Sequence, residues 1–191
     1  MPAKKAVHIT YFVHGTTVDN ERHLSSGWYD TELSELGIKQ SIELRDKIKG
    51  KKFDVVYCSD LKRAVDSAKL TFGDTVEIIQ DKRLRECDYG AFTQTKSEEM
   101  DRLMREHISK PFPSGKGYRG ESYEDVEKRM RKFCRDLLKK YMGKNVAIVA
   151  HRAPQLALDV IIGGKTWEQA MREDWRVVGK WQPGWEYILK E

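Results

Sequence analysis

The sequence predicts a three-layer α/β sandwich with a mostly parallel central sheet. Short apolar runs rich in β-branched residues alternate with longer segments whose apolar residues repeat every three or four positions. Such alternation of strand and helix is typical of a parallel sheet covered by helices on both faces. Polar, chemically useful residues follow several of the apolar runs. Because the carboxyl ends of parallel strands meet at one edge of the sheet, a functional site is expected there.

The first predicted strand begins at Val7, in an apolar, β-branched and aromatic run that suits a buried parallel strand. It ends at His14, because Gly15 and the polar residues after it break the pattern. A histidine at the carboxyl end of a buried strand points into the crevice where open α/β sheets bind ligands. His14 is therefore a candidate nucleophile.

The alternation of elements continues through a polar loop at 20–30, a helix at 33–48, a strand at 53–58, a second helix and a short strand at 76–79. Leucines and isoleucines on one side predict the first of these helices, among them Leu36. Ser59 or Asp60 is expected to cap the second helix. Glu86 follows the third strand, so it belongs to the same edge of the sheet.

The middle of the chain, residues 89–120, is its least regular part. It is expected to hold one short helix over 97–108 and a Pro/Gly-rich loop over 111–120. Structured-looking sequence resumes at once. The stretch is therefore interpreted as an insertion over the site within a single domain of residues 1–191, rather than as a linker.

The C-terminal third continues the same pattern. A capping-box-like Ser-x-x-Asp at 122–125 starts a long amphipathic helix. A fourth buried strand at 145–150 ends at His151, and a helix begins near Pro154, a residue suited to a first turn. Residues 176–189 are expected to form two strands joined by a Pro-Gly turn, antiparallel at the sheet edge.

Composition excludes several functional classes. The net charge of +5 favours anionic substrates, but basic and acidic residues are interleaved, so no nucleic-acid partner is expected. No apolar run could span a bilayer and the N-terminus lacks a signal-peptide core, so no membrane association is expected. Three distant cysteines indicate neither a disulfide framework nor a zinc site, which points to the cytoplasm. No feature indicates a homo-oligomer, and none excludes one.

Four candidate groups thus gather at one edge of the predicted sheet: His14, Arg63, Glu86 and His151. Arg63 is informative by itself, because it lies in the first turn of a helix, where the partial positive charge favours acidic residues. A cation there suggests a nearby anion, and helix N-termini bind phosphate readily. The alternative is that Arg63 pairs with Asp60 or Asp66 on the surface.

In this order the residues resemble the histidine phosphatase superfamily, also called the phosphoglycerate-mutase-like fold. The similar segments are His14–Thr17 with Asn20, Gly27–Asp30 with Leu33–Gly37, Ser59–Ala64, Leu84–Glu86 with Gly90, Gly120–Ser122, and Ala150–His151. They resemble that family's Arg-His-Gly-x-Thr-x-x-Asn, Gly-Trp-x-Asp, Leu-Thr-Glu-Leu-Gly, Ser-Asp-Leu-x-Arg-Ala, acid-bearing, Gly-Glu-Ser and second-histidine segments. The resemblance covers nearly the whole chain, and the motifs fall at predicted element boundaries, which makes the match specific.

The resemblance implies a phosphohistidine mechanism that needs no metal ion and no cofactor. His14 would attack phosphorus, and Glu86 would protonate the leaving alkoxide and then activate water. Arg63 and His151 would hold the phosphoryl oxygens and balance their charge. The substrate would be a small phosphorylated molecule, with these residues around it: Gly15, Thr16, Asn20, Ser26, Gly27, Tyr89 and Arg152.

Two departures from the family pattern stand out. The family normally has arginine just before the nucleophilic histidine, and this chain has Val13, which cannot clamp a phosphate. Arg152, where the family usually has glycine, is the expected replacement, and Arg22 is a less favoured one. Alternatively, the site is impaired. Gln94 also stands where family members often have glycine.

The sequence therefore predicts a cytoplasmic, metal-independent phosphomonoesterase. One alternative is a non-catalytic module that binds phosphorylated ligands or regulates another protein. Another is a phosphoglycerate-mutase-like isomerase, since family mutases grip a second anionic group with basic residues. The only comparable cluster here is Lys110, Lys116 and Arg119, which is interpreted as part of a solvated loop.

Overall fold

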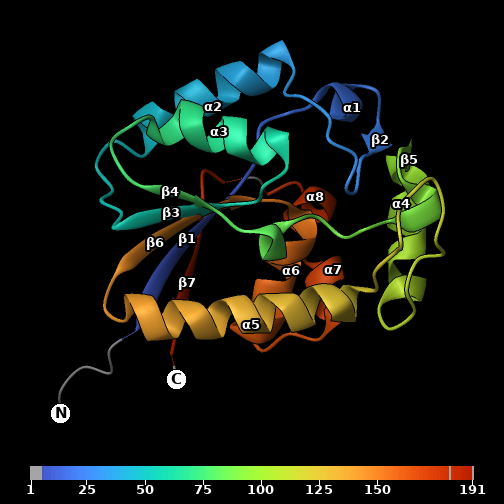
Figure 1. Cartoon of the computed structure of the whole chain (residues 1–191). Helices are drawn as coiled ribbons and strands as arrows, with labels where there is room; N and C mark the ends of the chain where they lie inside the picture. The colour runs from blue at the N-terminus through green and yellow to red at the C-terminus, as the bar shows by residue number, and fades with distance from the viewer. Residues whose placement is uncertain (1–5, 181, 191) are drawn as a thin grey trace.

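The computed structural model describes residues 6–180 and 182–190, which form a sheet between two layers of helices (Figure 1). The sheet has the order β4-β3-β6-β1-β7, with strands β1 (Val7–Val13), β3 (Val55–Cys58), β4 (Ile78–Gln80), β6 (Asn145–Ala150) and β7 (Trp185–Leu189). The larger helices are α2 (Glu35–Lys47), α3 (Lys62–Phe72), α5 (Tyr123–Tyr141), α6 (Arg152–Ile161) and α7 (Trp167–Arg172). Helices α2 and α3 cover one face, and α5, α6 and α7 lie on the other. The predicted three-layer α/β fold is confirmed.

Strand register brings the two candidate histidines to one level of the sheet. β1 lies between β6, with which it runs parallel, and β7, with which it runs antiparallel. Val13 is paired with Ala150, so His14 and His151 leave neighbouring strands at the same height. The amide of His14 donates to the carbonyl of Ala150 at 3.0 Å. β3 is parallel to both β6 and β4, so the segments after these strands reach the same edge.

The apolar core occupies both faces of the sheet. One cluster packs Phe12 and Val56 against Phe72 of α3, and a larger one packs Tyr11 and Ile148 toward the α5 and α6 side. Burial on both faces explains why these strands are continuous apolar runs rather than alternating ones. Within residues 6–180 and 182–190, we find no helix with the length and hydrophobicity needed to cross a membrane.

Helix starts follow local capping chemistry, with one correction. α5 begins with the predicted capping box, in which Ser122 and Asp125 satisfy each other's backbone amides. The predicted cap of α3 by Ser59 or Asp60 is wrong, because its N-cap residue is Leu61 and makes no side-chain capping bond. Instead, Asp30 from a distant loop accepts a hydrogen bond from the Lys62 amide at 2.7 Å. Among the predicted core positions, Leu36 on α2 is exposed.

The irregular middle section sits beside the loop that follows β1. The small elements are α1 (Val18–Glu21), β2 (Leu24–Ser25), β5 (Thr95–Lys96) and α4 (Ser97–Leu103), with 3₁₀ turns at Lys82–Leu84, Gly90–Phe92 and Met104–His107. β2 and β5 pair as a separate two-stranded antiparallel sheet. Figure 1 shows α4 at one end of the molecule, next to α1 and β2. The helix predicted over 97–108 is thus α4 continued by a 3₁₀ turn.

The tail differs from the sequence prediction of two strands over 176–189. In the described part of this tail, β7 is the only strand and is antiparallel at the sheet edge as expected, and the residues before it include the short helix α8 (Trp175–Val178). The side chain of Asp174 accepts a hydrogen bond from the Arg176 amide and thereby starts α8, while Gly179 ends it at a φ of 66°. Trp181 lies outside the described residues.

Candidate active site

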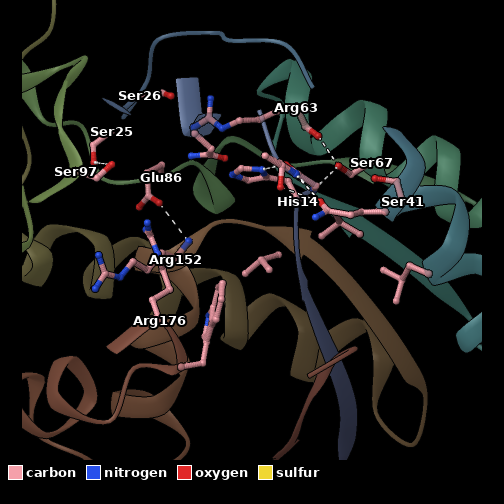
Figure 2. A pocket seen from close by; sticks show the side chains of 18 of the residues that line it. His14, Ser25, Ser26, Ser41, Arg63, Ser67, Glu86, Ser97, Arg152 and Arg176 are labelled. Carbon is pink, nitrogen blue, oxygen red and sulfur yellow. Dashed lines mark hydrogen bonds between the residues drawn. The ribbon is translucent and has the colours of Figure 1, made fainter. Parts of the chain in front are cut away.

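A pocket of about 590 Å³ opens where β1 and β6 end (Figure 2). Nearly all the predicted site residues line it: His14, Gly15, Thr16, Asn20, Ser26, Gly27, Arg63, Glu86, Tyr89 and Arg152. His151 does not line the pocket but lies behind His14, with ring centroids 5.0 Å apart. The topology therefore brings together residues that are far apart in the sequence.

The tautomer of His14 follows from one contact. Its Nδ1 lies 2.7 Å from the carbonyl oxygen of Gly15. A carbonyl oxygen can only accept a hydrogen bond, so Nδ1 carries the proton. Nε2 of the neutral ring then keeps its lone pair, as a nucleophile requires.

The electrostatic surroundings keep His14 neutral. Removal of the ring from water and the nearby Arg63 guanidinium lower the pKa of His14 to about 3, against a weaker opposing effect of the Gly15 carbonyl. Near neutral pH the imidazole therefore holds a single proton. The hydroxyl of Ser67 on α3 accepts a hydrogen bond from the Gly15 amide at 3.0 Å and so ties the residue after His14 to that helix.

The lowered pKa of His14 predicts a specific loss of stability in acid. Between the pKa of a histidine in an unfolded chain, about 6.5, and the folded value, the unfolded state binds a proton that the folded state does not. Lowering the pH through that window therefore reduces the free energy of unfolding. For this one group the reduction is at most about 1.4 kcal/mol per pH unit, and partial exposure of the ring makes it smaller.

Urea unfolding at pH values of about 7 and about 5 tests this expectation. The wild type should lose more stability between the two values than His14→Gln, which carries no titrating group at this position. The other titratable groups are the same in both proteins, so the difference reports on His14 together with its charge interaction with His151. Equal losses would show that the site does not suppress protonation of His14.

His151 is the most enclosed of the candidate groups. Its side chain is fully buried, and among the described residues neither ring nitrogen has a hydrogen-bond partner. Its backbone is fixed by Tyr11, whose hydroxyl donates to the His151 carbonyl at 2.6 Å and accepts from its amide at 3.0 Å. Burial, together with the charge of Arg63, lowers the pKa of His151. Buried polar nitrogens normally have partners, so an anion beside His14 would complete this site.

Arg63 is oriented by the loop that precedes α2. Its guanidinium donates to the carbonyls of Gly27 at 2.7 Å and Tyr29 at 2.9 Å. It pairs with neither Asp60 nor Asp66, which contact Arg85 and Lys62 instead. The surface-pairing alternative for Arg63 is therefore wrong. A buried guanidinium held by two neutral carbonyls keeps its full charge for an anion.

Glu86 lies at the N-terminus of α6 (Figure 2). Its Oε1 accepts hydrogen bonds from the amides of Cys87 at 2.8 Å and Ala153 at 3.1 Å, and its Oε2 from the Arg152 amide at 3.2 Å. Backbone donors from two segments thus fix the carboxyl group at the pocket wall. A carboxyl group so placed can exchange a proton with a bound molecule.

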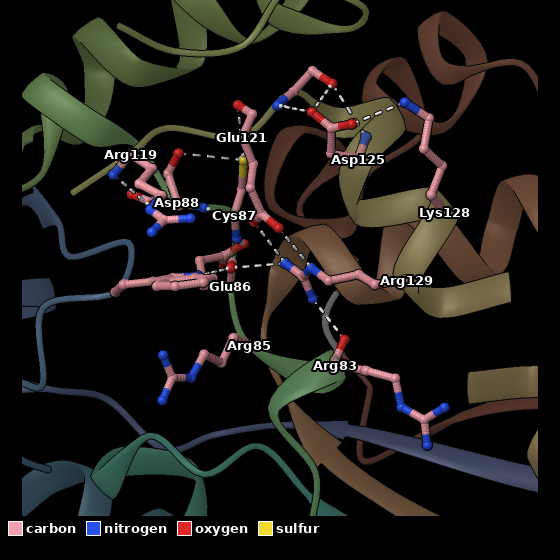
Figure 3. Close-up of polar contacts among 12 residues, drawn as sticks. Arg83, Arg85, Glu86, Cys87, Asp88, Arg119, Glu121, Asp125, Lys128 and Arg129 are labelled. Carbon is pink, nitrogen blue, oxygen red and sulfur yellow. Dashed lines mark hydrogen bonds and ion pairs between the residues drawn. The ribbon is translucent and has the colours of Figure 1, made fainter. Parts of the chain in front are cut away.

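A second group of side chains holds the segment around Glu86 (Figure 3). Arg129 of α5 forms an ion pair with Glu121 and donates to the carbonyl of Glu86 at 2.9 Å. The indole N–H of Trp28 donates to the same carbonyl at 2.7 Å. Glu121 also accepts from the Asp88 amide at 3.1 Å. Trp28 and Glu121 belong to the recognised motifs, but sequence reasoning gave them no role and missed Arg129.

The side chain of Arg152 does not take the role predicted for it. Its guanidinium forms ion pairs with Asp174 and Asp101. Although burial opposes the effect, these two carboxylates raise the pKa of Arg152. In this structure the charge of Arg152 is therefore matched by carboxylates, and it does not fill the place of the arginine missing at Val13. Its backbone amide nevertheless contacts Glu86.

Other predicted residues shape the pocket rim. The amide and hydroxyl of Thr16 both donate to the side chain of Gln40 at 2.9 Å. The Asn20 side chain closes the capping box of α1, and the Ser26 hydroxyl donates to Asp19 at 2.9 Å. Gln94 has a φ of 61°, a conformation that glycine tolerates best, which fits the glycine common at this position in the resembled family.

The short helix α8 also contributes to the pocket. Arg176 of α8 lines it beside Trp175, although the sequence prediction placed Arg176 in a strand at the sheet edge. A short helix inside a Trp-rich tail carries no periodic signal long enough to reveal it. The described residues contain no group of three or more His, Cys, Asp or Glu side chains that could hold a metal ion.

Comparison with known proteins agrees with the motif pattern. Residues 11–178 match the histidine phosphatase superfamily (branch 1). The chain is 28% identical over 151 residues to phosphoserine phosphatase 1 of Hydrogenobacter thermophilus, covering 72% of this chain and 71% of that protein. It is 29% identical over 171 residues to a 2,3-bisphosphoglycerate-dependent phosphoglycerate mutase of Methylobacterium sp., covering 81% and 80%.

A solved structure supports the same assignment. A mycobacterial glucosyl-3-phosphoglycerate phosphatase superposes with a TM-score of 0.75 at 26% identity, over 87% of this chain and 84% of that chain. Both the family match and the superposition cover most of the chain. This protein therefore belongs to branch 1 of the histidine phosphatase superfamily.

Proposed function

We propose that this protein hydrolyses a small phosphomonoester through a phosphohistidine formed on Nε2 of His14. The observation that carries the proposal is the hydrogen bond between Nδ1 of His14 and the Gly15 carbonyl, which leaves Nε2 unprotonated. In the first step the Nε2 lone pair attacks phosphorus and the ester P–O bond breaks. Protonated Glu86 gives its proton to the leaving alkoxide.

The second step reverses the roles. Glu86, now ionised, takes a proton from water as the water oxygen attacks phosphorus, and the P–N bond breaks to release phosphate and neutral His14. Arg63 and His151 hold the phosphoryl oxygens in both steps, since one carries a fixed charge and the other has unused ring nitrogens. Amides near Gly15 and the side chain of Asn20 complete the phosphate pocket. These guanidinium and imidazole groups supply the charge balance that magnesium supplies in kinases, so turnover needs no metal.

Hydrolysis is favoured over phosphoryl transfer between two positions of a phosphoglycerate. A mutase must grip a second anionic group, and the comparable basic cluster of this chain is Lys110, Lys116 and Arg119. None of them lines the pocket. The amine of Lys116 donates to the Thr93 carbonyl at 2.9 Å. Phosphatases as well as mutases occur among the named relatives, so both activities are within the family's range.

Hydrolysis of an aryl phosphate in the presence of a chelator tests the proposal. We expect phosphate release with no loss of rate on addition of the chelator. Isothermal titration with inorganic phosphate distinguishes the competing class of function, because a binding module would bind phosphate without turning over any ester. Phosphate release abolished by the chelator and restored by a metal ion would contradict the metal-independent mechanism. No release from aryl phosphate or from a panel of sugar, amino-acid and nucleotide monophosphates would contradict the hydrolase.

We further propose that the protein works in the cytoplasm. Cys58, Cys87 and Cys134 are free and buried, which supports a reducing setting. Burial raises the pKa of the Cys58 and Cys134 thiols to about 12, so they remain inert thiols rather than nucleophiles.

A further inference from the structure

Arg176 is a cation of the pocket that the mechanism above does not use. Arg176 lies on α8, lines the pocket together with Val13 and Trp175, and is exposed. Within residues 6–180 and 182–190, its guanidinium forms no hydrogen bond or ion pair. Its charge reaches the nucleophile, because it contributes to the lowered pKa of His14. Figure 2 shows Arg176 on the same side of the pocket as Arg152, below Glu86.

Charge balance singles out Arg176 from the other two arginines of the pocket. Arg63 already faces His14, and a phosphomonoester dianion needs a second cation when arginine is absent from position 13. Arg152 is paired with Asp174, whose side chain is fully buried, and with Asp101. Breaking a buried ion pair to release a guanidinium is costly, because it leaves an uncompensated carboxylate. The guanidinium of Arg176 can bind an anion without breaking an ion pair.

The position of α8 depends on contacts with α6. A helix of four residues is unstable by itself, so its neighbours must hold it. Asp174 joins the two helices, because one carboxylate oxygen accepts from the Arg176 amide and the other pairs with Arg152. The indole N–H of Trp175 donates to Gln155 of α6 at 3.2 Å.

We propose that Arg176 binds the phosphoryl oxygens of the substrate in place of the arginine missing at position 13, and that the Arg152–Asp174 ion pair holds α8 so that Arg176 can do so. The proposal rests on the proposed phosphomonoester substrate. It makes Arg176 a substrate-binding residue and Arg152 a positioning residue that acts through it. Arg152 then serves the site without touching the phosphate.

The role of Arg176 is tested by measuring the affinity for inorganic phosphate with isothermal titration calorimetry. Losing a charge-assisted hydrogen bond should weaken phosphate binding by Arg176→Gln about 10- to 100-fold. Arg176→Lys should recover part of the loss, as a point charge without the bidentate geometry. The matched control is Arg172→Gln, which removes an exposed cation from α7 that does not line the pocket and should bind phosphate like the wild type.

The outcomes separate this proposal from the proposed function. If Arg176→Gln binds phosphate as tightly as the wild type, the proposed role of Arg176 is overturned. A higher KM of this variant for a larger ester would then mean that Arg176 contacts the leaving group rather than the phosphate. Wild-type protein that binds phosphate but hydrolyses no ester overturns the hydrolase, while the affinity comparison still decides on Arg176. Circular dichroism of each variant checks that the fold is intact.

The role of Arg152 is tested with a double substitution that removes both charges of the buried ion pair, so that neither is left without its partner. Arg152→Gln/Asp174→Asn removes both charges, and asparagine keeps an oxygen that can cap α8. In the wild-type background, this double substitution should weaken phosphate binding. In the Arg176→Gln background it should not weaken phosphate binding further, because Arg152 acts only through Arg176. A full, additional loss in the Arg176→Gln background would show that Arg152 contacts phosphate directly and would overturn the positioning role.

Discussion

Replacing His14 with alanine is expected to abolish phosphate release and to remove every trace of covalent phosphate from the protein. The reason is that, among the described residues that line the pocket, His14 is the side chain whose protonated ring nitrogen is held by a backbone carbonyl while its other nitrogen keeps a lone pair. Without the nucleophile, hydrolysis would require direct attack by water, a slower single step. Steady-state release from an aryl phosphate and acid-quenched labelling with a radioactive phosphate ester measure the two effects.

The control for this change is His8→Ala. His8 is an exposed histidine on the same strand, and it lies outside the pocket. It should retain wild-type turnover and labelling. Turnover or labelling that persists in His14→Ala would assign the nucleophile to another residue and would contradict the proposed mechanism.

The second large effect is expected from Glu86→Gln, which should slow turnover by about 100- to 10,000-fold. Glutamine can still accept hydrogen bonds from the amides of Cys87 and Ala153, so the segment should keep its position. It cannot, however, donate and then recover a proton. The loss should therefore be greater for an alkyl phosphate, whose leaving group needs protonation, than for a nitrophenyl phosphate.

The comparison of the two substrates is the decisive measurement for Glu86. Equal losses for both esters would mean that Glu86 positions the loop without transferring a proton to the leaving group. Glu98→Gln is the matched control, because Glu98 is an exposed carboxylate of the neighbouring helix α4 and does not line the pocket. It should leave both rates unchanged.

The strands and the residues at their ends could be predicted from the sequence because their causes are local. A buried strand such as β6 needs a continuous apolar run, and the residue that ends the run, His151, falls at the edge of the sheet. The capping box at Ser122 and Asp125 is similarly a pattern of four consecutive residues. Register then follows from the parallel pairing and brings His14 beside His151.

Long-range polar contacts could not be predicted in the same way. The partners of Arg152 are Asp101 and Asp174, at sequence separations of 51 and 22 residues, and nothing in the local pattern selects them over other acids. The cap of α3 comes from Asp30, a separation of 32 residues from Lys62. These choices depend on which loops the fold places side by side. The sequence therefore located Arg152 at the site but gave its side chain the wrong partner.

The small sheet of β2 and β5 limits how the protein can be recombined with its relatives. Leu24 pairs with Lys96 and Ser25 with Thr95, so the loop after β1 and the middle section share one set of backbone hydrogen bonds. A chimaera that exchanges only one of these segments would leave the other strand with a mismatched register. Both must be transplanted together as one unit of exchange. The groups on the main sheet, including His14, can meanwhile stay in the host chain, which makes the two regions separable in protein engineering.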